Sequence, residues 1–375
     1  MRFLLSSILL ILISQAPSAL ARTAYDCANP ATSGSFSLSE DCTLSGEVSL
    51  SGDLDILGVP KGDGSYPVIT AAASSRHFKM DSVDKLTLKY LKMVDGDVYS
   101  NEWPNTSGGS IYARGNIILN ISDSEFFNNK GSLGGAISFR GGQSRDLFLS
   151  SVRFTKNHGN YGGAFWSHST NIVDHSCTYT ANTATRKGGA VALYWETQAS
   201  FFGSSFINNT VADKGGAINA ETCPTLLNAP TCEKEVILQS VTLKFNKQTG
   251  GGTDALHGGG GLYLAHNANA NIRDSTFIEN EATEGATGDK HGHQIFTEKD
   301  GESSPSLTIV NTQFTHIAGN NAFYGDAGYF SPTTCSAQEP CSVAPFTGAC
   351  TDLGDEGTTC DINCPSGSYA PSKEA

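Results

Sequence analysis

The side chains of this sequence that could carry chemistry are aromatic, cationic and imidazole groups at fixed distances after pairs of glycines. Three or five residues after the second glycine of a pair, the chain places Tyr112, Arg114, Arg140, Trp166, His168 and Tyr194. Aromatic ring faces pack against sugars, and guanidinium groups bind the anionic groups of acidic saccharides. The set predicts a glycan-binding surface. The alternative is an ordinary exposed β-surface, on which aromatic residues are common.

A carbohydrate-active enzyme, either a polysaccharide lyase or a glycoside hydrolase, is the alternative function for such a surface. A lyase needs clustered aspartates for calcium and a basic side chain, and a hydrolase needs two or three carboxylates close together. Glu221 is the one acid at the equivalent positions. The sequence therefore favours a protein without catalytic activity, and no catalytic residue is assigned.

Isolated fragments of other functional motifs occur elsewhere in the chain. The segment Thr249–His257 (TGGGTDALH) nearly matches a calcium-binding nonapeptide, but a lone copy cannot form the stacked half-sites that hold the ion. Asp174, His175 and Ser176 are residue types of a catalytic triad, yet adjacency in sequence does not produce triad geometry. No metal site and no cofactor is predicted.

The ten cysteines indicate an oxidising compartment. Disulfides are favoured over zinc, because no paired CxxC motifs occur with histidines at ligand spacing. Cys27 and Cys42 close a short amino-terminal loop, and Cys223 and Cys232 bracket another. Five more cysteines crowd the carboxy-terminal end: Cys335, Cys341, Cys350, Cys360 and Cys364. Because five is odd, either one of them pairs with the rest of the chain or that module is incomplete here.

The first residues predict a signal peptide over residues 1–21, with Arg2 before an apolar run and Ala19-Leu20-Ala21 as the cleavage pattern. The apolar run is too short to span a bilayer, and no later stretch reaches ~20 apolar residues, so we expect no transmembrane segment. The expected location is extracellular or at the cell surface. In that compartment three sequons become candidate N-glycosylation sites, at Asn105, Asn120 and Asn208.

An internal repeat of about 27 residues dominates the sequence. One half is a glycine pair followed by a small and an apolar residue, with copies beginning at Gly108, Gly134, Gly162, Gly188, Gly215 and Gly260 and a degenerate one at Gly292. The other half is an aromatic residue followed three positions later by asparagine, as in Phe126/Asn129, Phe154/Asn157, Tyr179/Asn182, Phe206/Asn209 and Phe277/Asn280. Short alternating apolar runs before the aromatic residue predict strands with one buried face.

One coil of a parallel β-helix fits this repeat best, since a propeller blade needs roughly 40 residues. Successive coils stack at about 4.8 Å, so equivalent residues should lie directly above one another. We expect the asparagines to form an amide ladder, the aromatic residues an interior column and the glycine pairs a corner. The 41 glycines suit such turns.

The alternation within each repeat assigns faces to its side chains. Counted from the second glycine, positions two and four should point inward, and positions three and five outward. In the copy that begins at Gly260, this places Tyr263 and Ala265 inward. Cys177 falls level with inward apolar residues and is predicted to be a buried thiol. Asp174 falls level with the inward Leu149, which is a local departure from the pattern.

The paired GGA(I/V) and FxxN motifs resemble the repeats of the polymorphic outer-membrane protein family, over roughly residues 108–320. That family belongs to the pectin-lyase-like right-handed parallel β-helices, so the resemblance implies this fold and a surface-exposed adhesive role. The implied partners are an extracellular polysaccharide or a cell-surface glycoprotein. Nucleic acid is excluded as a partner by the net charge of −13.

The expected fold class is therefore all-β, a right-handed parallel β-helix with a small cysteine-rich carboxy-terminal segment. After the signal peptide, residues 22–107 are expected to form an amino-terminal cap and the first irregular coils. Residues 108–328 form the repeat β-helix, and residues 329–375 form the cysteine-rich module. The expected function is adhesion, matrix formation or glycan binding outside the cell.

Overall fold

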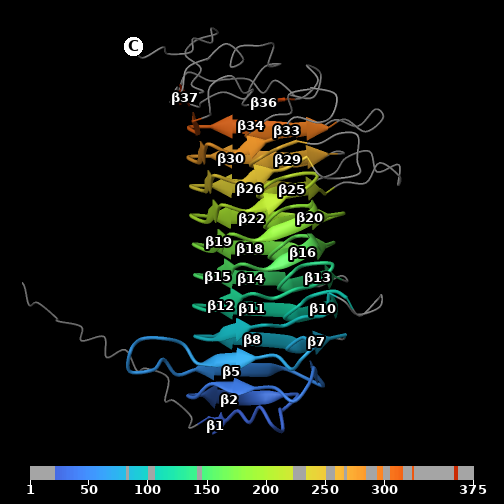
Figure 1. The fold of residues 1–375 in the computed structure, drawn as a ribbon, viewed down its shortest axis with the longest axis vertical. Coiled ribbons are helices and arrows are strands. Elements are labelled where there is room, and N and C mark those ends of the chain that lie inside the picture. Colours follow the sequence, from blue (N-terminus) through green and yellow to red (C-terminus); the bar gives the residue numbers. More distant parts are fainter. Residues whose placement is uncertain are drawn as a thin grey trace, which may run out of the picture.

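The computed structural model is a right-handed parallel β-helix, a tall stack of coils with the first strands at one end and the last at the other (Figure 1). It describes residues 22–81, 84–99, 106–141, 146–222, 234–250, 258–265, 268–283, 294–298, 305–315, 323–324 and 359–361. The fold is all-β, and these residues contain no helix. The fold class expected from the repeat is confirmed.

Four sheets run along the stack, and the two longest contain eleven strands each. Sheet A consists of β1 (Thr23–Ala24), β2 (Gly34–Leu38), β5 (Leu54–Gly58), β8 (Lys85–Lys89), β11 (Ile118–Ser122), β14 (Asp146–Ser150), β18 (Asn171–His175), β22 (Gln198–Phe202), β26 (Glu235–Gln239), β30 (Asn269–Arg273) and β34 (Ser306–Val310). Sheet B consists of β3 (Cys42–Thr43), β6 (Val68–Thr70), β9 (Lys92–Val94), β12 (Glu125–Phe127), β15 (Arg153–Thr155), β19 (Thr178–Thr180), β23 (Ser205–Ile207), β27 (Thr242–Lys244), β31 (Thr276–Ile278), β35 (Gln313–Thr315) and β37 (Thr359–Asp361).

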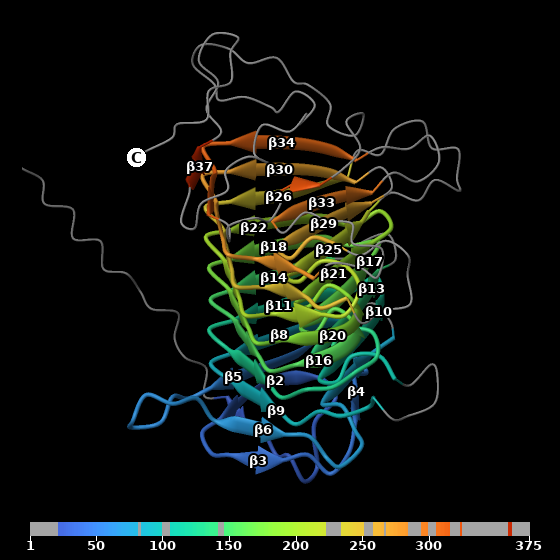
Figure 2. The ribbon, with the colours of Figure 1, turned by 45° about the horizontal axis from the view of Figure 1, so that its top comes forward.

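Two further sheets complete the coils. Sheet C consists of β4 (Val48–Ser49), β7 (Phe78–Met80), β10 (Ile111–Gly115), β13 (Ile137–Gly141), β17 (Phe165–His168), β21 (Val191–Tyr194), β25 (Ile218–Glu221), β29 (Leu262–Ala265), β33 (Ile295–Glu298) and β36 (Phe323–Tyr324). Sheet D consists of β16 (His158–Tyr161), β20 (Thr183–Lys187), β24 (Thr210–Val211), β28 (Lys247–Gln248) and β32 (Glu281–Ala282). The coils that begin at β14, β18, β22, β26 and β30 pass through sheets A, B, D and C in that order, whereas the earlier coils pass from sheet B to sheet C without a sheet D strand. Figure 2 shows the strands stacked along the coils.

The aromatic residues of the repeat form a column inside the stack. Four fully buried rings pair in register across sheet B: Phe126, Phe154, Tyr179 and Phe206. Their neighbouring centroids lie 5.1, 5.0 and 4.5 Å apart, with interplanar angles of 11° or less. Leu243 continues the column, and Phe277 and Phe314 then stack at 5.0 Å. Stacking buries a shared apolar column, as the repeat predicts.

The asparagines of the repeat form the predicted ladder at the turn that follows sheet B. The ladder contains Asn129, Asn157, Asn182, Asn209, Asn246 and Asn280, all almost fully buried. At each step the side-chain amide and the backbone N–H of one asparagine donate to Oδ1 of the next, as from Asn157 to Asn182 at 3.0 Å each. Asn182 Nδ2 also donates to the carbonyl of Phe154 at 2.9 Å. The asparagine side chains therefore form hydrogen bonds with buried backbone N–H and C=O groups at the turn, where no β-strand pairing is available.

The glycine pairs form the corner between sheets D and C, and the two glycines serve different purposes. The first has a positive φ, as at Gly188 (+66°), where side chains are disfavoured. The second lies against the neighbouring coil, and a Cβ at Gly189 would lie 2.0 Å from the carbonyl oxygen of Gly216. A side chain there would prevent the coils from stacking.

The sixth glycine pair begins at Gly259, so the phase expected from Gly260 is wrong by one residue. Gly259 has the positive φ (+68°), and Leu262 and Leu264 occupy the inward positions in register with Ile218 and Ala220. Tyr263 therefore faces outward, although it is fully buried. Within a run of four glycines, the order of residues alone does not show which pair forms the corner.

Both ends of the stack are covered. At the amino-terminal end the predicted disulfide joins Cys27 to Cys42, and short strands extend sheets A, B and C. At the other end β37 pairs antiparallel with β35, unlike the parallel pairs of the rest of the stack. A reversed strand ends the parallel stacking and leaves a different edge from that of a repeat coil.

Candidate functional site

Four of the six predicted glycan-binding residues stand in one column on the outer face of sheet C. Arg114 pairs with Arg140, Arg140 with His168, and His168 with Tyr194 across four consecutive strands. The two arginines are exposed, and His168 and Tyr194 are half-buried. We call this set of four the outer column. Parallel pairing places its members about 4.8 Å apart along the stack.

Aromatic rings gather at the carboxy-terminal half of the outer column. Trp166 lies 5.7 Å from His168 and 6.1 Å from Tyr194 between ring centroids, but it is only 7 % exposed. Trp195, which the repeat did not single out, is 41 % exposed and lies 5.4 Å from His168. The repeat could not indicate its exposure, because β21 ends at Tyr194 and a turn with a positive φ at Glu196 (+50°) follows, so strand alternation no longer applies to Trp195.

Tyr112 lies apart from these rings. It is separated from Trp166 by one coil, in which Ser138 occupies the equivalent position. The guanidinium of Arg76 lies over the Tyr112 ring at 5.1 Å and forms an ion pair with Glu47 at 2.8 Å. Tyr112 thus packs with the amino-terminal coils, and the structure does not bring it to the aromatic cluster.

Carboxylates on the same face are neutralised by lysines. Glu221, next in register after Tyr194, is 5 % exposed and accepts from Lys187 at 2.6 Å. Glu298 lies two coils further along the same column and pairs with Lys214 at 3.0 Å. Within the part of the chain that the structure describes, no three His, Cys, Asp or Glu side chains gather as a metal site would require.

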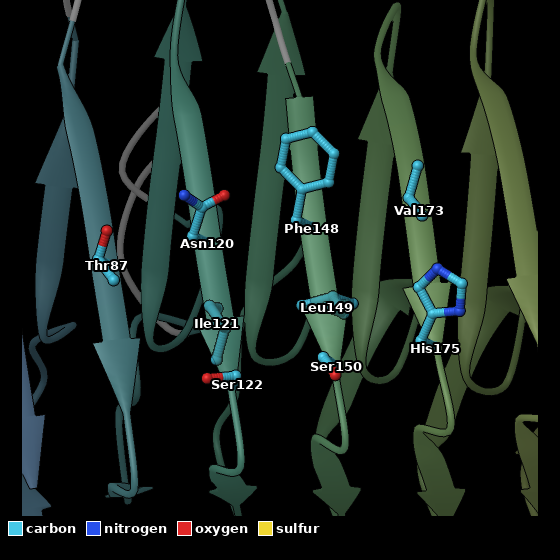
Figure 3. A pocket seen from close by; sticks show the side chains of 9 residues that line it. All are labelled: Thr87, Asn120, Ile121, Ser122, Phe148, Leu149, Ser150, Val173 and His175. Carbon is cyan, nitrogen blue, oxygen red and sulfur yellow. The ribbon is translucent and has the colours of Figure 1, made fainter. Parts of the chain in front are cut away.

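A shallow depression lies on the outer face of sheet A (Figure 3). It runs across β8, β11, β14 and β18 and is lined by Thr87, Asn120, Ile121, Ser122, Phe148, Leu149, Ser150, Val173 and His175. Asn120 and Phe148 are direct neighbours in register. The ring of Phe148 is 43 % exposed. The repeat motifs did not indicate this surface. They identify the inward-facing residues of these strands, whereas the exposed side chains of the depression occupy the positions between them.

Asp174 departs from its column, as the sequence indicated, and lies fully buried between the levels of Leu149 and Phe201. It accepts a hydrogen bond from the Tyr179 hydroxyl at 2.5 Å and another from Ser204. Burial raises the pKa of Asp174 from 3.8 to about 6, against the lowering effect of these hydrogen bonds. Nearby, burial also raises the pKa of the Cys177 thiol, which is a buried free cysteine as predicted.

The modification sites and cysteines divide between described and undescribed segments. Asn120 lies in β11, and Asn208 lies in the exposed turn after β23. Cys360 lies in β37. The following predicted residues and segments lie outside the described residues: residues 1–21, Asn105, Cys223, Cys232, Cys335, Cys341, Cys350 and Cys364. The segment Thr249–His257 lies largely outside them as well.

Comparison with known proteins finds a match to one repeat. The model of the Chlamydia polymorphic membrane protein (Chlamydia_PMP) repeat matches residues 203–221, which confirms the resemblance of the motifs. This segment runs from β23 through the corner at Gly215 and Gly216 to β25, and so covers one FxxN and one GGAI motif. No curated protein and no solved structure matches the chain. Among the described residues, no helix is long and apolar enough to cross a bilayer.

Proposed function

We propose that this β-helix acts outside the cell or at its surface as a binding protein without catalytic activity, and that it binds acidic glycans along the outer column. The match to a repeat of a membrane protein family supports a surface location. The signal peptide expected over residues 1–21 supports the same location. Binding is assigned to Arg114 and Arg140, with His168 and Trp195 beside them.

The observation that carries this proposal is the direct pairing of Arg114 with Arg140. Like charges opposite one another on neighbouring strands destabilise a sheet. Both side chains are exposed, and no carboxylate of the described residues forms an ion pair with either one. These two arginines face the same side of the sheet although the whole chain carries a net charge of −13. A carboxylate or sulfate group bound between the two guanidinium groups would relieve their repulsion.

The aromatic residues beside the arginines suit the rest of a sugar polymer. Trp195 presents the most exposed ring of the cluster, and the half-buried His168 lies between it and Arg140 in the outer column. Each coil repeats the same spacing on a rigid face, so a linear polysaccharide could contact several coils without ordering a loop. A preformed surface lowers the entropic cost of binding.

The test measures binding of the full chain to polygalacturonate, to a sulfated polysaccharide and to a neutral glucan by biolayer interferometry at low salt. We expect the wild type to bind the two acidic polymers, with affinity that falls as salt rises. The double variant R114Q/R140Q should bind at least about tenfold more weakly, a loss of about 1.4 kcal/mol. Trp195→Ala should weaken binding as well. Trp166 is a less suitable position for this test, because its side chain is buried and offers little surface to a ligand.

The matched control is Arg273→Gln, which removes an exposed arginine from sheet A and should leave binding unchanged. Equal binding by the double variant and the wild type would refute the proposed site, as would a wild type that binds neither acidic polymer. Analysis of the polymers after incubation separates binding from the enzymatic alternative. Appearance of new reducing or unsaturated ends would assign a carbohydrate-active enzyme instead.

A further inference from the structure

Two exposed phenylalanines lie beside the asparagines of two sequons. We propose that Asn120 and Asn208 carry N-linked glycans, and that the first N-acetylglucosamine of each glycan packs on the phenylalanine of the next coil, Phe148 and Phe245. The inference depends on passage through the secretory pathway. It does not depend on glycan binding by the outer column, because the residues involved lie on other faces of the stack.

Asn120 lies in the middle of β11 with its side chain on the outer face of sheet A. Figure 3 shows its amide beside the ring of Phe148, in one row with Thr87 and Val173. Register pairing makes Asn120 and Phe148 direct neighbours on parallel strands about 4.8 Å apart. The amide of Asn120 makes no hydrogen bond to the described residues, whereas Asn171 on the same face donates to Asp146 at 3.1 Å. Its nitrogen is therefore open for substitution.

Asn208 lies in the turn that follows β23, with a φ of +55° and an exposed side chain. The next residue, Asn209, belongs to the buried ladder and donates to Asn246 in the following coil. Because Asn209 is level with Asn246, Asn208 is level with Phe245. Phe245 is 39 % exposed, and Lys244 Nζ lies 4.4 Å from its ring centroid on one side. The second sequon asparagine thus also lies beside a phenylalanine of the next coil, in the turn after sheet B instead of within sheet A.

Exposed phenylalanine is uncommon on this molecule, and at Phe245 it is also costly. The described residues contain five exposed large hydrophobic side chains: Val59, Ile118, Phe148, Trp195 and Phe245. Both phenylalanines of this set follow a sequon asparagine by one coil. Phe245 has a φ of +57°, a backbone conformation that a bulky side chain rarely adopts. A sugar ring that covers the phenyl face would bury apolar surface that otherwise contacts water.

The modification has a defined chemical course. A bond forms between Nδ2 of the asparagine and C1 of the first sugar of a polyprenyl-pyrophosphate-linked oligosaccharide. The bond from C1 to the pyrophosphate breaks, the lipid pyrophosphate leaves, and one amide proton is lost to a base. The hydroxyls of Ser122 and Thr210 complete the two sequons. Once attached, the sugar is held near the phenyl ring at high effective concentration, so a weak contact suffices.

The first experiment maps occupancy on the full chain, secreted from eukaryotic cells that make only high-mannose glycans. Enzymatic release of the glycans in heavy-oxygen water converts each occupied asparagine to labelled aspartate, which peptide mass spectrometry locates. We expect label at Asn120 and Asn208, with loss of one site in Ser122→Ala and of the other in Thr210→Ala. Absence of label at both asparagines of the wild type would overturn the proposal.

The second experiment tests the packing by thermal unfolding. Trimming each glycan to its first N-acetylglucosamine should leave the melting temperature unchanged, whereas Ser122→Ala and Thr210→Ala should each lower it by about 1–2 °C. In a Phe148→Ser background Ser122→Ala should have no further effect, and in a Phe245→Ser background Thr210→Ala should have none. The control Val59→Ser removes an exposed apolar side chain from elsewhere and should leave both glycan effects intact. Glycan effects of equal size with and without the phenyl rings would overturn the proposed packing.

Discussion

At the scale of single residues, Asp174 is the side chain that most clearly breaks the pattern of its column. Its neighbours in register are Leu149 and Phe201, and the whole column is buried. The hydrogen bonds from Tyr179 and Ser204 satisfy both carboxyl oxygens without supplying a positive charge. Burial without a cationic partner disfavours the ionised form of a carboxyl group, which is the cause of the raised pKa of Asp174.

This environment predicts a pH-dependent contribution to stability. The folded chain holds the proton of Asp174 more tightly than the unfolded chain, so this group's contribution falls as the pH rises from about 4 to about 6 and then levels off. The loss is about 3 kcal/mol. Burial lowers the pKa of His77 from 6.5 to about 4, which makes stability rise over nearly the same range.

The variant Asp174→Asn separates the two contributions, because it leaves His77 unchanged. Relative to the wild type, it should gain about 3 kcal/mol between pH 4 and pH 7, measured by urea unfolding at several pH values. A difference between the two proteins that stays constant with pH would contradict the assignment of a raised pKa to Asp174.

At the scale of elements, the corner between sheets D and C sets how closely the coils stack. The ladder asparagines and the aromatic column occupy adjoining parts of the same coil, and both require neighbouring coils to stay in register. The second glycine of each pair provides that closeness, because backbone of the next coil occupies the space where a Cβ would lie. At the second position of each pair, glycine is therefore required mainly because a Cβ would clash with the neighbouring coil, and less because of the backbone conformation.

Two glycine variants test this explanation. Gly189→Ala places a Cβ 2.0 Å from the carbonyl oxygen of Gly216, and it should cost at least about 4 kcal/mol. Gly203→Ala is the control: its φ is +65°, but its Cβ would meet only Ser176 Oγ at 3.6 Å. It should cost about 1–2 kcal/mol. Thermal or urea unfolding compares the two, and equal costs would show that close stacking does not set the requirement.

At the scale of the whole molecule, the stack has two ends, at which the strands of a repeat coil would be left unpaired if nothing covered them. Parallel coils present the same edge at every level, so an uncovered end invites another chain to add to it. The Cys27–Cys42 disulfide and short strands lie at one end, and the antiparallel strand β37 covers part of the other. Within the described residues, β37 therefore adds a strand next to the last repeat coils (Figure 1).

Removal of the tail should therefore cause association. A chain that ends at residue 328 lacks β37 and should form dimers or larger species, measured by size-exclusion chromatography with light scattering. A chain that lacks only residues 362–375 keeps β37 and is the control, which should match the full-length protein. If the chain ending at residue 328 has the same mass as the control at equal concentration, β37 is not what protects this end.

Much of the fold could be predicted from the sequence, because equivalent positions in stacked coils carry side chains of the same chemical kind. The period, the amide ladder, the aromatic column and the buried Cys177 all follow from residues that repeat at one level of the coil. The phase at Gly259 did not follow, because four successive glycines offer several equivalent corners. Only the pairing of β29 with β25 selects one.

The candidate sites were harder to predict from the sequence than the fold, because they depend more on the tertiary structure. Residue order placed Arg114, Arg140 and His168 in one outer column, since position within the repeat is enough for that. It could not show that Trp166 is covered while Trp195 is exposed, or that Phe148 and Phe245 stand beside sequon asparagines. Exposure and neighbours across coils depend on segments distant in sequence, whereas periodicity is a local property of the chain.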